Sequence, residues 1–174
     1  MAAAIRILGL DPGLRRTGWG VVDSRDNRLS YVASGAIAPN TKLETAARLN
    51  LLYEGVCRLI EAWLPDESAV EEIFVNKNPS STLRLGQARG VVMLAPAQAG
   101  ITVAEYAANA VKKAVVGAGH ADKNQIQAMV RMLLPTAEPE SADAADALAV
   151  AICHAHHATT RLAWQAQPAT APSA

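Results

Sequence analysis

The order of the hydrophobic patterns along the chain restricts its fold more than any other feature of the sequence. Three apolar runs of the β type come first, at residues 5–10, 19–22 and 29–37, and short polar turns separate them. Runs spaced so closely predict an antiparallel meander of three strands. Helical and strand-like patterns then alternate along the rest of the chain. This order predicts an α/β fold with one mixed, five-stranded sheet flanked by helices.

The elements after the meander are marked by apolar spacing and by proline. Apolar residues recur at helical intervals over residues 49–63, and Pro65 follows that helix closely. Asp122 is predicted to cap a helix that Pro135 stops. Pro96 is predicted to end its own helix early. The other expected elements are strands at 68–75 and 101–105 and helices at 82–93, 109–116 and 141–157.

Length and composition predict one domain without a membrane span. The chain has 174 residues, 51% of them apolar but only 4% aromatic, and its 36 alanines suit closely packed helices. No apolar stretch approaches the ~20 residues of a spanning helix, and two cysteines are too few for a disulfide framework. We therefore expect a single cytoplasmic domain over residues 1–160, followed by a flexible tail at 161–174.

A net charge of zero hides an uneven distribution of charged residues. Residues 73–134 carry seven Lys or Arg side chains against two acids, whereas residues 135–160 carry four acids and neither Lys nor Arg. A basic region beside an acidic cluster is what an enzyme needs to act on a polyanion through bound cations. Ordinary solvated surfaces give the same pattern, so charge alone leaves both interpretations open.

Four acidic residues occur where an apolar side chain is the norm. Asp11 ends an apolar strand, Glu71 lies within another, and Asp143 and Asp146 share one face of an otherwise apolar helix. A cluster of four carboxylates either takes up protons or binds cations, and oxygen ligands favour Mg²⁺ or Mn²⁺. Two such ions together clamp the attacking and leaving oxygens of a phosphoryl displacement. Each acid also has a structural explanation: a turn residue at 11, an outward-facing strand residue at 71, and charges that complement a helix N-terminus at 143 and 146.

Five sequence blocks, taken in order, resemble the RuvC family of Holliday-junction resolvases. They are ILGLDPGLRRTGWGVV at 7–22, AVEEIFVNKN at 69–78, LGQARGV at 85–91, VKKAVVGAG at 111–119 and ADAADALAVAI at 142–152. The resemblance implies an RNase H-like fold and a homodimer that cuts four-way DNA junctions symmetrically during recombination and repair. It implies two Mg²⁺ ions per subunit, for which Mn²⁺ can substitute, and association with a branch-migration motor.

The same resemblance assigns roles to individual positions. The catalytic, metal-binding carboxylates would be Asp11, Glu71, Asp143 and Asp146. The basic residues needed for activity would be Lys112 and Lys123. Phe74, the one phenylalanine of the chain, corresponds to an aromatic residue that packs against a junction base, although a place in the core is the alternative. Lys77, Arg84 and Arg89 are expected to contact DNA phosphates, with solvated surface positions as the alternative.

Other functions are compatible with parts of the sequence. Metal ligands by residue type also occur at Cys153, His154, His156 and His157, but no second ligand pair elsewhere in the sequence supports zinc. Actin-like ATPases and sugar kinases also have an Asp-x-Gly turn after a strand, but they need two such domains. A nucleic-acid-binding module that keeps the RNase H-like fold without cutting is the remaining alternative, and the four retained acids count against it.

Overall fold

The computed structural model describes residues 3–26, 28–72 and 78–165, with their side chains up to residue 158. Its strands are β1 (Ile5–Asp11), β2 (Thr17–Arg25), β3 (Arg28–Ile37), β4 (Glu67–Glu71) and β5 (Thr102–Tyr106). They form one sheet with the order β3-β2-β1-β4-β5. The first three strands are antiparallel neighbours, and β4 and β5 run parallel to β1. The prediction of a mixed five-stranded sheet is confirmed.

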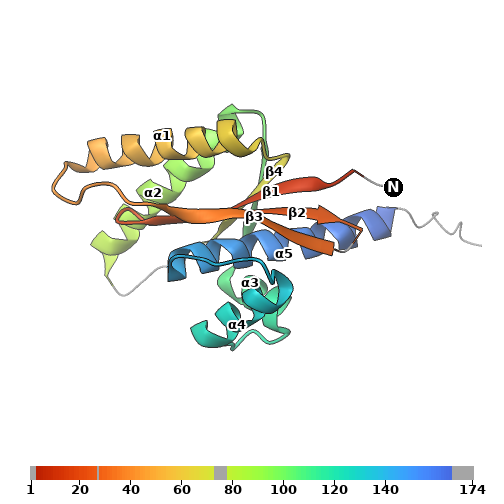
Figure 1. Ribbon diagram of the computed structural model, residues 1–174. Helices are drawn as coiled ribbons and strands as arrows, with labels where there is room; N and C mark the ends of the chain where they lie inside the picture. Colours follow the sequence, from red (N-terminus) through yellow and green to blue (C-terminus); the bar gives the residue numbers. More distant parts are fainter. Residues whose placement is uncertain (1–2, 27, 73–77, 166–174) are drawn as a thin grey trace, which may run out of the picture.

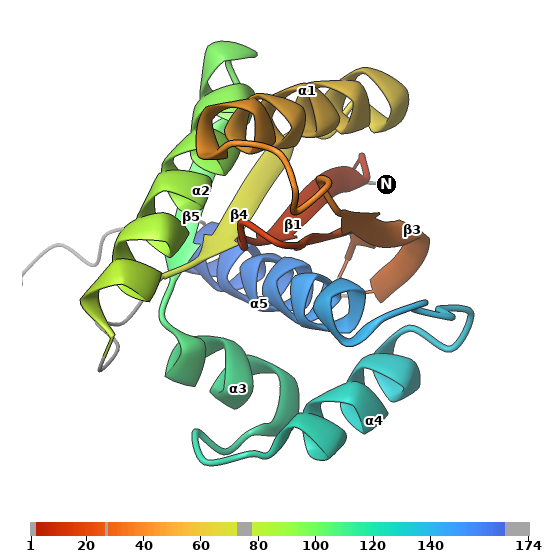
Figure 2. The same ribbon diagram turned by 90° about the vertical axis from the view of Figure 1, so that its left-hand side faces the viewer.

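Helices cover both faces of this sheet. They are α1 (Thr45–Trp63), α2 (Pro79–Gln98), α3 (Ala108–Val116), α4 (Lys123–Leu133) and α5 (Ala142–Gln165). The α1 and α2 helices lie on one face, and α5 crosses the other face with α3 and α4 packed beyond it (Figure 1). Figure 2 looks onto the end of the sheet where β1 finishes and α5 begins.

The alternation of side chains along β1 and β4 directs two acids to the α5 face. Ile7 belongs to the apolar cluster under α5, whereas Leu8 and Leu10 belong to the cluster under α1 and α2. Because side chains alternate along a strand, Asp11 faces the same way as Ile7. Ala69 and Val70 on β4 divide between the same two clusters, so Glu71 also faces α5. The parallel register pairs Leu10 with Val70, which sets the two acids side by side at the strand ends.

Two glycines allow α5 to lie directly against the sheet. A Cβ atom at Gly9 would lie 2.2 Å from the carbonyl oxygen of Ala147, and one at Gly18 would lie 2.0 Å from the carbonyl oxygen of Asp143. Any other residue would therefore push the helix away from the sheet. These contacts bring the first turn of α5 to the end of β1.

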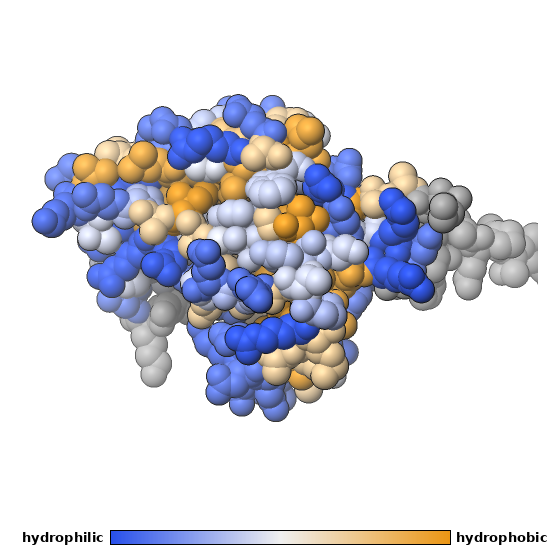
Figure 3. Space-filling view, in the orientation of Figure 1, coloured by the Kyte–Doolittle hydropathy of each residue, from blue (hydrophilic) through white to orange (hydrophobic). Residues whose placement is uncertain are grey.

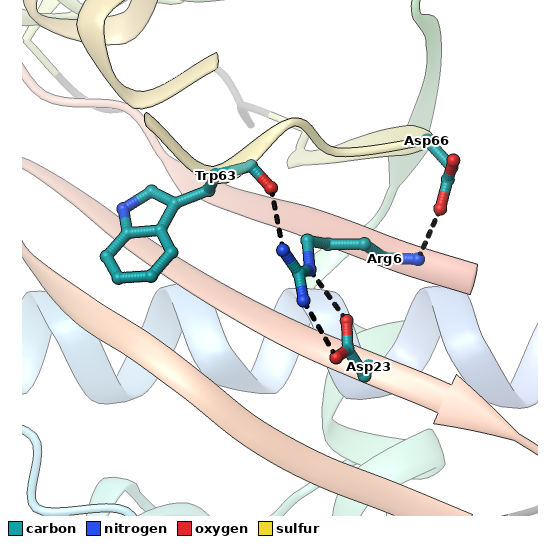
Figure 4. Close-up of polar contacts among 4 residues, drawn as sticks. All are labelled: Arg6, Asp23, Trp63 and Asp66. Atoms are coloured by element: carbon teal, nitrogen blue, oxygen red, sulfur yellow. Dashed lines mark hydrogen bonds and ion pairs between the residues drawn. The ribbon is translucent and has the colours of Figure 1, made fainter. Parts of the chain in front are cut away.

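At the opposite end of β1, Arg6 binds Asp23, Trp63 and Asp66 (Figure 4). Its guanidinium donates from Nε and Nη2 to the two carboxylate oxygens of Asp23, at 2.8 and 3.0 Å, and from Nη1 to the carbonyl oxygen of Trp63 at 3.0 Å. Its backbone N–H donates to Asp66 Oδ2 at 2.7 Å, and its carbonyl accepts from the Asp66 N–H at 2.8 Å. Bidentate guanidinium–carboxylate pairs are geometrically specific, so β1, β2 and the connection from α1 to β4 are fixed together here.

The prediction that Pro96 ends its helix early is wrong, because α2 continues to Gln98. A proline in a helix removes one N–H donor, but this one lies in the last turn, where little of the helix remains to be disrupted. The Ala99 N–H still donates to the Ala95 carbonyl, and the Pro96 carbonyl accepts from Ile101 at 2.9 Å.

Two other helix boundaries differ from the sequence-based expectation. The α2 helix begins at Pro79, where the side chain of Asn78 caps it by accepting from the N–H groups of Ser80 and Ser81. The last helix, α5, runs to Gln165, past the predicted end near residue 157. Residues 166–174 of the predicted tail lie outside the described residues.

The described helices include none that is both long enough and apolar enough to cross a membrane. On the face shown in Figure 3, apolar side chains appear as separate patches among hydrophilic ones.

Replacing Gly18 with alanine is expected to destabilise the fold by about 2 kcal/mol or more, because a methyl group has no room beside the Asp143 carbonyl. Urea unfolding monitored by circular dichroism measures the change. Gly119→Ala is the control, since the nearest heavy atom to its new Cβ is the Asn109 carbonyl oxygen at 4.0 Å. Equal stability of the two variants would contradict the close approach of α5.

Candidate active site

A cavity of about 360 Å³ lies at the end of the sheet where β1 and β4 finish and α5 begins. The charged side chains that line it are Asp11, Glu71, Lys112, Lys123, Asp143 and Asp146. These are the six residues expected to be catalytic, and they come from β1, β4, α3, α4 and α5. The fold therefore collects acids that are up to 135 positions apart in sequence, from residue 11 to residue 146, into one site.

Burial and mutual repulsion favour the protonated forms of these acids. The pKa of Asp11 is raised to about 7, first by burial and then by the charges of Glu71, Asp146 and Asp143. Burial also raises the pKa of Glu71 and of Asp146, and a neighbouring carboxylate adds to each shift. Carboxylates held at such cost to the folded state are typical of a functional site.

Two lysines offset part of this repulsion. Lys123 Nζ lies 3.8 Å from Asp146 Oδ2, and its positive charge opposes the upward pKa shifts of Asp11, Glu71 and Asp146. Lys112 opposes the shift of Glu71 in the same way. The Lys123 side chain remains largely exposed, so its ammonium group can also meet a ligand that enters the cavity.

Local structure explains where Lys123 sits. Asp122 caps α4 as predicted: its carboxylate accepts from the Gln125 N–H at 2.9 Å, and the Gln125 side chain accepts from the Asp122 N–H at 3.0 Å. This capping box fixes the first turn of α4. Gly117, with φ of 85°, ends α3 and lets the chain turn back toward the cavity.

Arg16 contacts the site through Asp143, and the sequence analysis did not identify it. Its Nε lies 3.7 Å from Asp143 Oδ2, so it neutralises part of the charge at the start of α5. The sequence offered one indication of this role for Arg16. The residue lies in the turn after Asp11-Pro12-Gly13, and that turn follows a strand that carries a candidate acid.

The donor set fits hard divalent cations, although it is not pre-assembled around one. In the described part of the chain, no three His, Cys, Asp or Glu side chains are grouped closely enough to hold an ion as they stand. Asp143 and Asp146 instead contact Arg16 and Lys123. Four carboxylates around one cavity supply the oxygen ligands that Mg²⁺ and Mn²⁺ prefer, and a cation would relieve the repulsion that raises the pKa of Asp11.

Of the four residues predicted to contact DNA, the structure describes Arg84 and Arg89. Arg84 lines a second cavity. Asp143 lines both this cavity and the first one. Arg89 is not among the lining residues of either cavity: it pairs with Glu105, and its Nε donates to the Glu71 carbonyl at 3.2 Å. Phe74 and Lys77 lie outside the described residues.

The cysteine and histidines near the end of α5 have contacts of their own. His154 is buried, with Nε2 at 2.5 Å from Glu67 Oε2 and Nδ1 at 2.9 Å from the Tyr106 hydroxyl. His156 Nδ1 donates to the Ala114 carbonyl, and His157 stacks on Tyr106. Burial raises the pKa of the Cys153 thiol to about 12. Contacts within the fold thus account for the positions of the three histidines, and burial accounts for that of Cys153.

Comparison with known proteins gives consistent matches over nearly the whole chain. The family model for the crossover junction endodeoxyribonuclease RuvC matches residues 7–154. A protein of that name from Rhodopseudomonas palustris (strain BisA53) is 63% identical over 153 residues, which are 88% of each chain. The structure of Thermus thermophilus RuvC in complex with Holliday junction substrate has a TM-score of 0.84 at 30% identity, covering 90% of this chain and 96% of that one. The yeast mitochondrial Holliday junction resolvase Ydc2 shares the fold, with a TM-score of 0.67 at 12% identity and coverage of 92% and 83%.

Ionisation of the buried acids is expected to lower the stability of the metal-free protein as pH rises from about 5 to 8. The pKa of Asp11 is about 7 in the folded state and near 4 in an unfolded chain, so the folded protein holds more protons over this range. Its free energy of unfolding should therefore fall, by about 2 kcal/mol. Urea unfolding in EDTA at several pH values measures this decrease in the free energy of unfolding.

The Asp11→Asn variant should show a clearly weaker pH dependence, because the largest shift is removed. Glu61→Gln, a change at an exposed acid of α1 on the opposite face of the sheet from α5, should keep the wild-type dependence. A free energy of unfolding that rises over the same pH range in the wild type would contradict the assignment.

Proposed function

The chain belongs to the RuvC family of crossover junction endodeoxyribonucleases, and from this we propose that it hydrolyses a phosphodiester of four-way junction DNA in the carboxylate cavity. The observation that carries the proposal is the cavity itself, where four carboxylates and two lysines converge from five elements. A module that only bound DNA would gain nothing from buried acids that repel both one another and the phosphates. We also propose that residues 1–160 form one nuclease domain.

The proposed cofactor is a pair of Mg²⁺ ions in each subunit, for which Mn²⁺ can substitute. Their ligands would be the four carboxylates, Asp11, Glu71, Asp143 and Asp146. When bound, such ions supply positive charge to the attacking and leaving oxygens of the phosphoryl displacement. The support lies in the oxygen-rich donor set and in the raised pKa of Asp11, Glu71 and Asp146, which a cation would reverse.

The reaction forms one bond to phosphorus and breaks another. The oxygen of a water molecule attacks the phosphorus in line, and a carboxylate of the cavity accepts its proton. The bond from phosphorus to O3′ breaks, and O3′ takes a proton from solvent. The products are a 5′-phosphate and a 3′-hydroxyl end. Lys112 and Lys123 hold the scissile phosphate and stabilise the charge that develops on it.

Asparagine at position 11 or 146 is expected to lower cleavage of a synthetic four-way junction in Mg²⁺ by about 1000-fold or more, since each change removes a ligand charge. Gel analysis of a labelled junction measures the nicks, which should be paired and symmetric in the wild type. Junction binding in EDTA should survive in both variants, and Glu61→Gln, at an exposed position of α1, should cut normally. Tight junction binding without any cutting by the wild type in Mg²⁺ or Mn²⁺ would overturn the proposal.

A homodimer would present two such sites to two strands of one junction. The α2 helix offers a surface for it: Leu83 and Leu94 are 66% and 48% exposed, and a Cβ at Gly86 or Gly90 would meet no atom within 4 Å. At 3.6 residues per turn, these four positions share one side of the helix. Small residues flanked by leucines allow two helices to approach closely, so we propose that α2 packs against its copy.

Leu94→Glu is expected to convert the dimer to a monomer, because it buries a charge in the proposed α2–α2 contact. Sedimentation equilibrium at micromolar concentration measures the change. Met132→Glu is the matched control, since Met132 is a 70% exposed apolar residue on α4. A wild-type monomer, or a Leu94→Glu variant that remains dimeric, would contradict this interface.

A further inference from the structure

We infer that a second cavity, lined by four arginines beside the carboxylate cavity, binds the phosphate next to the scissile one on the same DNA strand. The inference rests on the proposed function and deepens it, because it assigns a further contact to the same substrate. This arginine cavity has a volume of about 420 Å³ and lies among the β1–β2 turn, the start of α1 and the start of α2. Its charged lining consists of Arg15, Arg16, Arg48, Arg84 and Asp143.

The cations of the arginine cavity are not balanced by acids. Asp143 is the one acid among its lining residues, and Arg16 contacts it at 3.7 Å. Among the described residues, neither Arg15 nor Arg84 has a carboxylate oxygen within 4.0 Å. Four guanidinium groups around one carboxylate raise the local positive potential, which an anion would offset.

The guanidinium group of Arg48 has a donor that lacks a hydrogen-bond acceptor within the described part of the chain, and this is an independent indication of an anion site. Its Nη2 donates to the Leu14 carbonyl at 2.8 Å and so holds the β1–β2 turn against α1. Its Nε is buried and has no hydrogen-bond partner among the described residues. Buried donors are nearly always paired, and phosphate oxygens are strong acceptors for guanidinium groups.

The start of α2 adds a polar wall to the arginine cavity. Ser81 lies in the first turn of this helix and lines the cavity with Arg84. Hydroxyl and guanidinium groups are common contacts of DNA phosphates. A phosphodiester therefore matches the chemistry of this lining.

The position of the arginine cavity ties it to the strand that is cut. Asp143 lines both this cavity and the carboxylate cavity, so the two share a wall. Successive phosphates of one strand are about 3.4 Å apart along a duplex axis. A strand whose scissile phosphate lies among the carboxylates, and which leaves that cavity past Asp143, brings a neighbouring phosphate to the arginine cavity.

Replacement of single phosphates by neutral methylphosphonates tests this contact. The probe is a synthetic four-way junction with one methylphosphonate next to the cut on the cleaved strand, and binding is measured in EDTA. Wild type should bind it about 5- to 10-fold more weakly than the unmodified junction. Arg15→Gln and Arg84→Gln should weaken binding of the unmodified junction similarly, lower its salt dependence by about 0.9 in log–log slope, and lose most of the methylphosphonate penalty.

Arg28→Gln is the matched control, because Arg28 is exposed at the end of the sheet remote from Asp11. It should keep wild-type binding and the full methylphosphonate penalty. If the penalty is the same in wild type and in both arginine variants, the arginine cavity does not hold that phosphate and the inference fails. The inference would also fail if the arginine variants instead lost the binding penalty of a methylphosphonate placed on an uncut strand. If the wild type does not cleave the unmodified junction in Mg²⁺, the proposed function itself is refuted.

Discussion

The carboxylate cavity depends on the direct contact of α5 with β1 and β2. Gly9 and Gly18 leave no room for a side chain between the sheet and the helix backbone. Because of this contact, the first turn of α5 reaches the end of β1, where the side-chain alternation has already turned Asp11 and Glu71 toward the same face. The four acids meet because two glycines are there, and no interaction among the acids themselves favours their meeting.

That arrangement works against the stability of the fold, since carboxylates that repel one another destabilise the state that brings them together. The compensation lies elsewhere in the molecule. Two apolar layers sandwich the sheet, and at its other end Arg6 binds β2 and the connection into β4 through five hydrogen bonds. The sheet is thus fixed at the end opposite the carboxylate cavity, which leaves the ends of β1 and β4 free to carry unfavourable charge.

Much of this organisation was predictable because it is local. Alternating and helical spacings lie within single elements, so the order of strands and helices, the Asp122 cap and the four candidate acids followed from the sequence. The arginine cavity did not, because its walls come from the β1–β2 turn, α1 and α2, and only packing brings them together. The error at Pro96 has a different origin: a proline in a last helical turn disrupts little, and sequence spacing did not show where that turn lay.

Arg84 and Arg89 show why residue type alone does not settle a role. Both were expected to contact phosphates, and both lie on α2. Positions five residues apart on a helix point about 140° away from one another, so the two side chains leave the helix on different sides. Arg84 faces the arginine cavity, whereas Arg89 faces the sheet, where it pairs with Glu105 and donates to the Glu71 carbonyl. It thereby joins α2 to the ends of β4 and β5, and it steadies the backbone that presents the Glu71 carboxylate to the cavity.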